Sequence, residues 1–179
     1  RSVEGGYSTA IGYVGTQSVD MIGAGICQTA STLYCAALYA ELDIVERSNH
    51  TKRVSYVPYS MDATIYAGDD YRNPNIDLKL KNGFRHPVYI ESSVGGGTCT
   101  FTIYGKKTDS SRQVDYVSTT LQEAYPEPQF VEDPNLPYGY TVQTQDAYPQ
   151  VVATLTKIVR VNGVETERSV LHTDKYKPS

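Results

Sequence analysis

The chain has 179 residues, of which 40% are hydrophobic and 20% charged, and its formal net charge is -4. These values predict a globular protein that can bury a core without disulfides or metals. The sequence pI is about 5.3 and no basic run occurs, which argues against nucleic acid as a partner. No apolar run is long enough to span a membrane. Because the chain opens at Arg1 without a methionine, we expect a preceding segment that carries a signal or membrane anchor.

One long helix is predicted over residues 27–43, CQTASTLYCAALYAELD. Ala30, Leu33, Ala37 and Ala40 repeat at helical spacing, and no proline interrupts them. The preceding residues 1–24 are rich in glycine and predict turns with one short strand around Tyr13.

The remainder of the first 106 residues is typical of β-structure. Residues 76–80 alternate apolar and polar side chains, and residues 87–94 and 98–105 flank a glycine loop, which predicts a hairpin. The expected fold class is therefore α+β, with one main helix that carries Cys27 at its N-terminus and packs on a mostly antiparallel sheet.

The C-terminal part predicts a separate β segment. Residues 121–139 contain four prolines and indicate an extended linker. Two β-like runs then flank Asn162-Gly163, a strong hairpin signal, so we expect this hairpin to dock on the main domain or lie beside it. The expected division is a main domain over 1–106, its remainder and a linker over 107–137, and a β segment over 138–179.

Cys27 is the candidate nucleophile. It follows the glycine-rich turn Gly23-Ala24-Gly25 and falls in the first helical turn, where unpaired N–H groups and the helix dipole favour a thiolate. The same N–H groups can stabilise an oxyanion. A small buried cysteine next to a turn is an equally good interpretation from spacing alone. Cys35 and Cys99 fit core positions, and Cys35 is about 12 Å along the helix from Cys27, too far for a disulfide.

A cysteine nucleophile needs a base, and His50, between the helix and the next strand, is placed to fold back on the helix start. An exposed loop histidine is the competing interpretation. Asp62 is the candidate to orient His50 or bind substrate, with an ordinary turn carboxylate as the alternative. Arg47, Lys52 and Arg53 form a basic cluster that either meets substrate carboxylates or is a solvated face.

The order of these motifs resembles the VanW domain family. The resemblance covers roughly residues 1–106, although Ala24 replaces a glycine that the family commonly has and Cys35 stands where another residue is usual. The motifs that carry it are Ile26-Cys27-Gln28, Ser31-Thr32-Leu33-Tyr34, Arg47 with His50, Ser55-Tyr56-Val57-Pro58, Asp62-Ala63-Thr64, Asp77-Leu78-Lys79 and Pro87-Val88-Tyr89-Ile90. Residues 138–179 more weakly resemble part of a G5 module.

The resemblance implies an extracytoplasmic enzyme of the Gram-positive type of cell envelope. It implies an L,D-transpeptidase that forms 3-3 cross-links between peptidoglycan stem peptides through a cysteine acyl-enzyme. Cys27, His50 and Asp62 would be catalytic, and the residues named at the end of this paragraph would bind substrate. No cofactor or metal is expected, and membrane contact is expected only through an anchor before Arg1. The expected substrate-binding residues are Arg47, Lys52, Arg53, Ser31 and Tyr56.

Two other functions remain open from the sequence. A cysteine peptidase or amidase that hydrolyses stem peptides would have the same cysteine-then-histidine order. A non-catalytic wall-binding protein is the other, because the chain has 16 tyrosines and G5 modules are thought to bind amino-sugars of the glycan.

Overall fold

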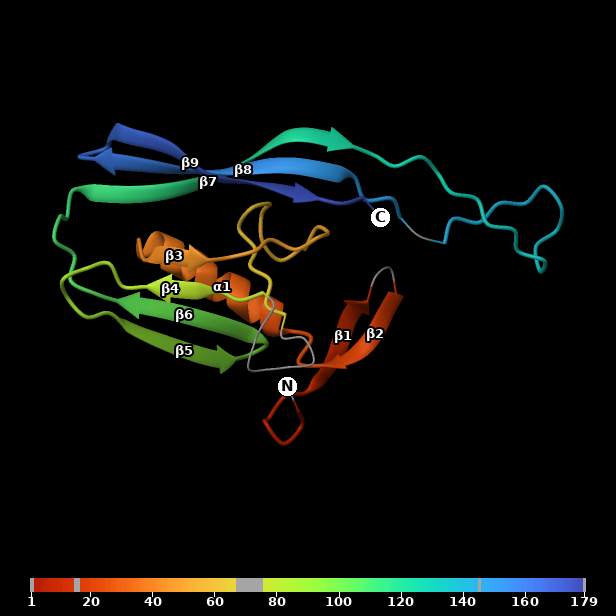
Figure 1. The fold of residues 1–179 in the computed structure, drawn as a ribbon, viewed down its shortest axis with the longest axis horizontal. Coiled ribbons are helices and arrows are strands. Elements are labelled where there is room, and N and C mark those ends of the chain that lie inside the picture. Colours follow the sequence, from red (N-terminus) through yellow and green to blue (C-terminus); the bar gives the residue numbers. More distant parts are fainter. Residues whose placement is uncertain (1, 15–16, 67–75, 145, 179) are drawn as a thin grey trace.

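The computed structural model describes residues 2–14, 17–66, 76–144 and 146–178. Within these residues the chain forms one helix and several antiparallel strand pairs (Figure 1). The broad α+β prediction is therefore confirmed. The elements in chain order are β1 (Thr9–Val14), β2 (Gln17–Ile22), α1 (Ile26–Tyr39), β3 (Asp43–Glu46), β4 (Lys79–Lys81), β5 (Tyr89–Gly95), β6 (Thr98–Tyr104), β7 (Arg112–Ala124), β8 (Gln150–Val161) and β9 (Val164–Tyr176).

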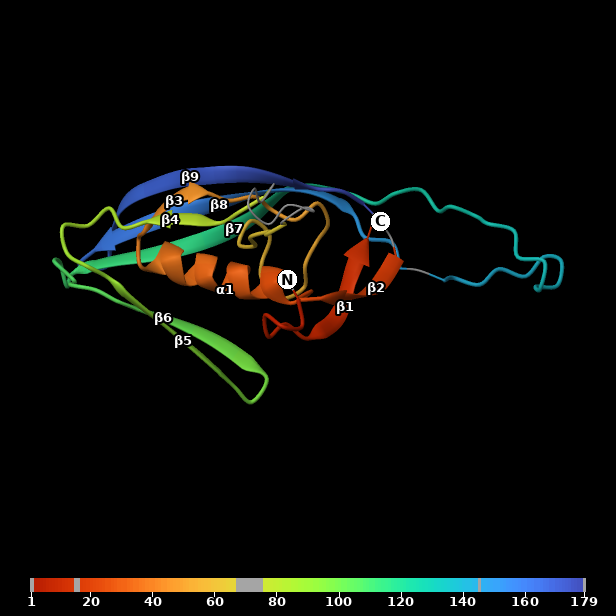
Figure 2. The same ribbon diagram turned by 60° about the horizontal axis from the view of Figure 1, so that its bottom comes forward.

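The largest sheet has the strand order β7-β8-β9 and covers one side of α1 (Figures 1 and 2). Helix residues Ala30, Tyr34 and Leu38 are buried in one cluster with Leu155 of the central strand β8, and Tyr116 of β7 packs against that cluster. The hydroxyl of Tyr116 also donates a hydrogen bond to the carbonyl of Leu38 at 2.6 Å. Burial of these apolar side chains holds the helix against the sheet.

Strands on both sides of residue 106 pack against the helix. Strands β3 and β6 of the first 106 residues contact α1, and strands β7 and β8, which begin at Arg112 and Gln150, add Tyr116 and Leu155 to its core. The missed strand is β7, whose half-buried and exposed residues alternate over its first eight positions, the pattern of a strand with one buried face. The C-terminal hairpin thus shares its core with the helix, and its likeness to a G5 module stays a prediction.

Two of the hairpins follow the predicted turn signals, whereas the region around Tyr13 forms the pair β1 and β2 instead of the one short strand expected. Asn162 and Gly163 have φ angles of 52° and 80°, as a two-residue turn between strands requires, and they join β8 to β9. Strands β5 and β6 pair around the predicted glycine loop, and this hairpin projects from the body in Figure 2. The expected linker begins later than predicted, because β7 extends to Ala124, and it forms part of the long excursion between β7 and β8 (Figure 1).

The helix ends earlier than predicted, at Tyr39 rather than residue 43. Glu41 has a left-handed φ of 55°, and the amides of Glu41 and Leu42 donate to the carbonyls of Leu38 and Ala37. This is the Schellman arrangement, which usually has glycine at the position of Glu41, so the sequence carries no ordinary stop signal. The Glu41 carboxylate binds Arg112 of β7 and Lys157 of β8, both at 2.7 Å, and thereby ties the helix end to the sheet.

Among the described residues, no helix is both long and apolar enough to cross a membrane.

Candidate active site

Cys27 lies in the first turn of α1, as the sequence predicts. Gly23 turns the chain into the helix with a φ of 70°, a conformation that favours glycine, whereas Ala24 is not among the residues with positive φ. The helix has no acidic residue in its first turn and no side-chain cap at Gly25. The positive end of the helix dipole is therefore left to act on the Cys27 thiol.

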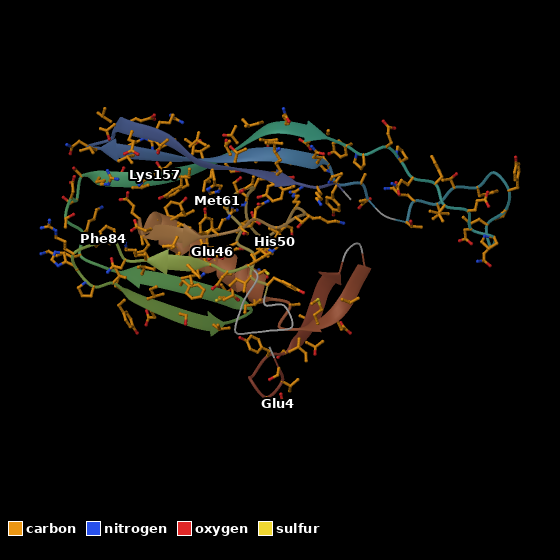
Figure 3. All side chains as sticks on the ribbon, viewed as in Figure 1. Glu4, Glu46, His50, Met61, Phe84 and Lys157 are labelled. Carbon is orange, nitrogen blue, oxygen red and sulfur yellow. The ribbon has the colours of Figure 1, made fainter. Side chains whose placement is uncertain are left out.

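His50 folds back to this helix start and is held by Asp62. The His50 Nδ1 lies 2.7 Å from Asp62 Oδ2, and the backbone N–H of His50 donates to the same oxygen at 2.6 Å. The side chain of Asp62 is 1% exposed and that of His50 is 18% exposed. Figure 3 shows His50 between the large sheet and the lower strands, close to the start of the helix. Because Asp62 occupies Nδ1, the other ring nitrogen, Nε2, is the one that can serve the thiol.

The charges of the site favour an ionised Asp62 beside a protonated His50. Burial alone lowers the pKa of His50, but hydrogen bonds to Asp62 and Cys27 and the negative charges of both outweigh it and raise the pKa to about 9. Burial alone raises the pKa of Asp62, but hydrogen bonds from His50 and Tyr176 and the charge of Arg47 outweigh it and lower that pKa. Asp62 therefore stays ionised and His50 stays protonated at neutral pH.

Arg47, which was expected to contact substrate, lies buried between Asp62 and Asp174. Its side chain is 6% exposed, and its Nη1 donates to Asp174 at 2.7 Å while its Nη2 donates to Asp62 at 3.1 Å. Its Nε donates to the carbonyl of Asp62 at 2.6 Å, and the guanidinium lies 5.3 Å from the centre of the Tyr34 ring. These contacts leave Arg47 no free face for a ligand, so its geometry is that of a support for Asp62.

Ser31 is likewise a brace rather than the expected substrate contact, because it is fully buried. Its hydroxyl donates to the carbonyl of Cys27 at 2.8 Å and accepts from the amide of Ala63 at 2.9 Å. It thus fastens the first turn of α1 to the segment that carries Asp62.

Tyr56 stands directly beside the reactive groups. Its hydroxyl lies 3.4 Å from His50 Nε2, and burial raises its pKa to about 12. The phenol is therefore neutral at physiological pH and has a proton to donate next to the thiol.

Of the remaining expected residues, Lys52 is half-buried and Arg53 is exposed, with its guanidinium 5.5 Å from the centre of the Tyr59 ring.

A shallow hollow of about 390 Å³ opens beside His50. Two cations that the sequence analysis did not single out, Lys175 and Lys177 of the last strand and its end, line it. Neither lysine forms an ion pair with a carboxylate of the described residues. The remaining lining residues are Asn49, Thr51, Gln150 and Tyr176.

The other cysteines fit structural positions. Burial, together with the nearby charge of Asp62, raises the pKa of Cys35 to about 11, so its thiol is protonated and inert at neutral pH. The three cysteines, all within described parts of the chain, form no disulfide. No group of three or more histidine, cysteine or carboxylate side chains suited to a metal ion occurs in the described ranges.

Comparison with known proteins supports the resemblance stated from the motifs. The family model described as "VanW like protein" matches residues 1–104. The uncharacterized protein YoaR of Bacillus subtilis (strain 168) is 35% identical over 113 residues, which is 63% of this chain and 35% of YoaR. The chain thus spans about a third of the length of this relative. No solved structure matches the present chain significantly. Since the family model covers more than half of the chain, the chain belongs to the VanW-like family.

Proposed function

We propose that this chain is the catalytic part of a peptidoglycan L,D-transpeptidase that works outside the cytoplasm. The observation that carries the proposal is the alignment of Cys27 at a helix start with His50 and the buried Asp62. A nucleophile, a base and a carboxylate that orients the base form the arrangement of covalent acyl transfer. The substrate class comes from the resemblance to the VanW domain.

The proposed reaction starts from a Cys27 thiolate and a protonated His50. The Cys27 thiolate attacks the carbonyl carbon of the third stem residue, and the C–N bond to the terminal D-alanine breaks as the His50 imidazolium gives its proton to the leaving amine. Neutral His50 then takes a proton from the side-chain amine of a neighbouring stem as that amine attacks the thioester. The C–S bond breaks, a new amide forms, and the thiolate and imidazolium are restored.

Tyr56 is proposed as a donor to the oxyanion of each tetrahedral intermediate. In the resting helix start, the amides of Ile26, Gln28 and Thr29 already donate to the carbonyls of Gly23 and Gly25. The neutral Tyr56 hydroxyl is a donor in reach of the same place. Removing one oxyanion donor typically costs roughly 10²-fold or more in kcat, so Tyr56→Phe is expected to lower kcat by about that factor. Steady-state kinetics measure it, and an unchanged kcat would assign Tyr56 to packing alone.

Lys175 and Lys177 replace Arg47 as the proposed partners of the stem carboxylates, because they line the hollow beside His50 and are exposed. Exposed ion pairs contribute little each, so Lys175→Gln with Lys177→Gln is expected to raise KM roughly two- to tenfold and leave kcat unchanged. The control is Lys106→Gln with Lys107→Gln, an equal change of charge in an exposed loop. If both double variants change KM equally, only overall charge matters and the subsite is wrong.

The experiment that tests the function uses purified disaccharide-tetrapeptide muropeptides and mass spectrometry of the products. Transfer yields cross-linked dimers together with free D-alanine. Shortened monomers and D-alanine without dimers would instead identify a peptidase, which shares the acyl-enzyme and differs only in taking water as the acceptor. Retention on insoluble peptidoglycan without any product, equal in Cys27→Ala, would identify a wall-binding protein.

A further inference from the structure

The end of strand β9 reaches the proposed catalytic carboxylate from more than 110 residues away in the chain. Tyr176 is 1% exposed, and its hydroxyl donates to Asp62 Oδ1 at 2.6 Å while it accepts the amide of Ser60 at 2.7 Å. Two positions earlier, on the same face of the strand, Asp174 is also buried and binds Arg47 at 2.7 Å. The last strand therefore contributes two polar side chains to the interior beneath His50.

These contacts divide the two oxygens of Asp62 between its partners. Oδ2 accepts hydrogen bonds from the backbone N–H and the ring Nδ1–H of His50, and Oδ1 accepts hydrogen bonds from Tyr176 and Arg47. With both oxygens occupied, the carboxylate has no low-energy rotation that keeps all of its hydrogen bonds. Its orientation, and therefore the direction of the His50 ring, depends on the groups that hold Oδ1.

Asp174 also balances charge. Protonated His50 and Arg47 face the carboxylates of Asp62 and Asp174, so two positive and two negative groups meet in a mostly buried cluster. Without the Asp174 carboxylate, Asp62 would be the one remaining carboxylate partner of Arg47 in this cluster, and the loss of a partner from a buried ion pair is strongly unfavourable. Arg47 would then pair more closely with Asp62, which would shift the Asp62 carboxylate away from His50 and weaken its pairing with the protonated ring.

We propose that Asp174 and Tyr176 are positioning residues of the catalytic site, which hold Asp62 so that His50 is aimed at Cys27. The proposal rests on the proposed roles of Cys27, His50 and Asp62. Both residues lie beyond the range 1–104 that the family model matches, so the C-terminal hairpin completes a site whose reactive groups all lie in the first 62 residues.

The test is an NMR titration of the His50 ring in the whole chain. Asp174→Asn removes a negative charge and frees Arg47, and both effects make protonated His50 less favourable. Two sets of polar and charged groups bear on this titration. His50 faces Asp62, Cys27 and Tyr56, with Lys175 and Lys177 around the hollow. Asp174 faces Arg47 and His172. The titration midpoint of His50 is expected to fall by about one pH unit, toward the ordinary value near 6.5.

The control is Glu165→Gln, which makes the same change of charge on the same strand in an exposed pair with Arg168, and it is expected to leave the midpoint in place. A folded Asp174→Asn protein with an unchanged His50 midpoint would overturn the proposal for Asp174, because a merely structural role does not move that titration.

Tyr176→Phe is the second variant and is the safer one for folding, because it keeps the ring that packs 5.0 Å from Tyr59, centre to centre. Alkylation of Cys27 by iodoacetamide and acylation by a carbapenem are expected to slow about tenfold, the effect of one hydrogen bond to a charged group. Unchanged rates would overturn the role of Tyr176. Neither the titration nor the alkylation requires cross-linking activity, so a chain that gives both expected results but no dimers would refute the transpeptidase alone.

Discussion

Cys27→Ala is expected to abolish both cross-linked dimers and the release of D-alanine while the fold remains intact. The thiolate is the only group in the proposed mechanism that forms a bond to the substrate, and no general base can replace it. The substitution removes only one sulfur from a half-buried side chain, so little packing is lost. Product analysis by mass spectrometry measures the activity, and thermal unfolding followed by circular dichroism checks the fold.

The matched control for this prediction is Cys35→Ala, in the same helix. Burial raises the pKa of Cys35 to about 11, so its thiol is not a nucleophile at neutral pH and the variant should keep its activity. The rate of iodoacetamide labelling against pH distinguishes the two thiols directly. Cys27 should react at pH 7 much faster than an ordinary thiol with a pKa of about 8.5. Cross-linking that persists in Cys27→Ala would exclude the nucleophile outright.

His50→Ala is expected to lower turnover by roughly 10²–10⁴-fold, the usual size of general acid–base catalysis by one side chain. It also removes the cation that pairs with the thiolate, so alkylation of Cys27 at pH 7 should slow in parallel. His86→Ala is a suitable control, because His86 is exposed in a turn outside the site. Equal kinetics for the two variants would remove His50 from the mechanism.

The raised pKa of His50 predicts how the reaction rate and the stability of the fold depend on pH. This pKa is raised to about 9 in the folded chain, compared with an ordinary value near 6.5. The wild-type rate should therefore fall as the pH rises through about 9, because His50 loses the proton that it gives to the leaving amine. The stability that its pairing contributes is complete below about pH 6.5 and is lost as the pH rises through about 9. Thermal unfolding from pH 6 to 10 should show this loss in the wild type and not in His50→Ala.

Local signals in the sequence were sufficient for the helix start and for the hairpins β5–β6 and β8–β9, but not for the hairpin β1–β2, where one short strand was expected. The glycine turn before Cys27 and the Asn162-Gly163 pair act over a few residues, so their conformations follow from backbone sterics that neighbouring sequence specifies. The same holds for the separation of Cys27 and Cys35 along one helix, which excludes a disulfide between them.

The parts that the sequence did not reveal depend on residues far apart in the chain. A basic cluster after the helix is compatible with substrate binding, and only the fold shows that Arg47 is enclosed by Asp62 and Asp174. The helix stop at Glu41 lacks the usual glycine and is stabilised by two cations from the distant strands β7 and β8. Nothing near residue 176 marks Tyr176 as a neighbour of the candidate active site. The sequence by itself determined which group is placed to react, because a helix terminus is local, and only the tertiary structure decided how the base is held, because buried hydrogen bonds and charge pairs form between segments that the fold brings together.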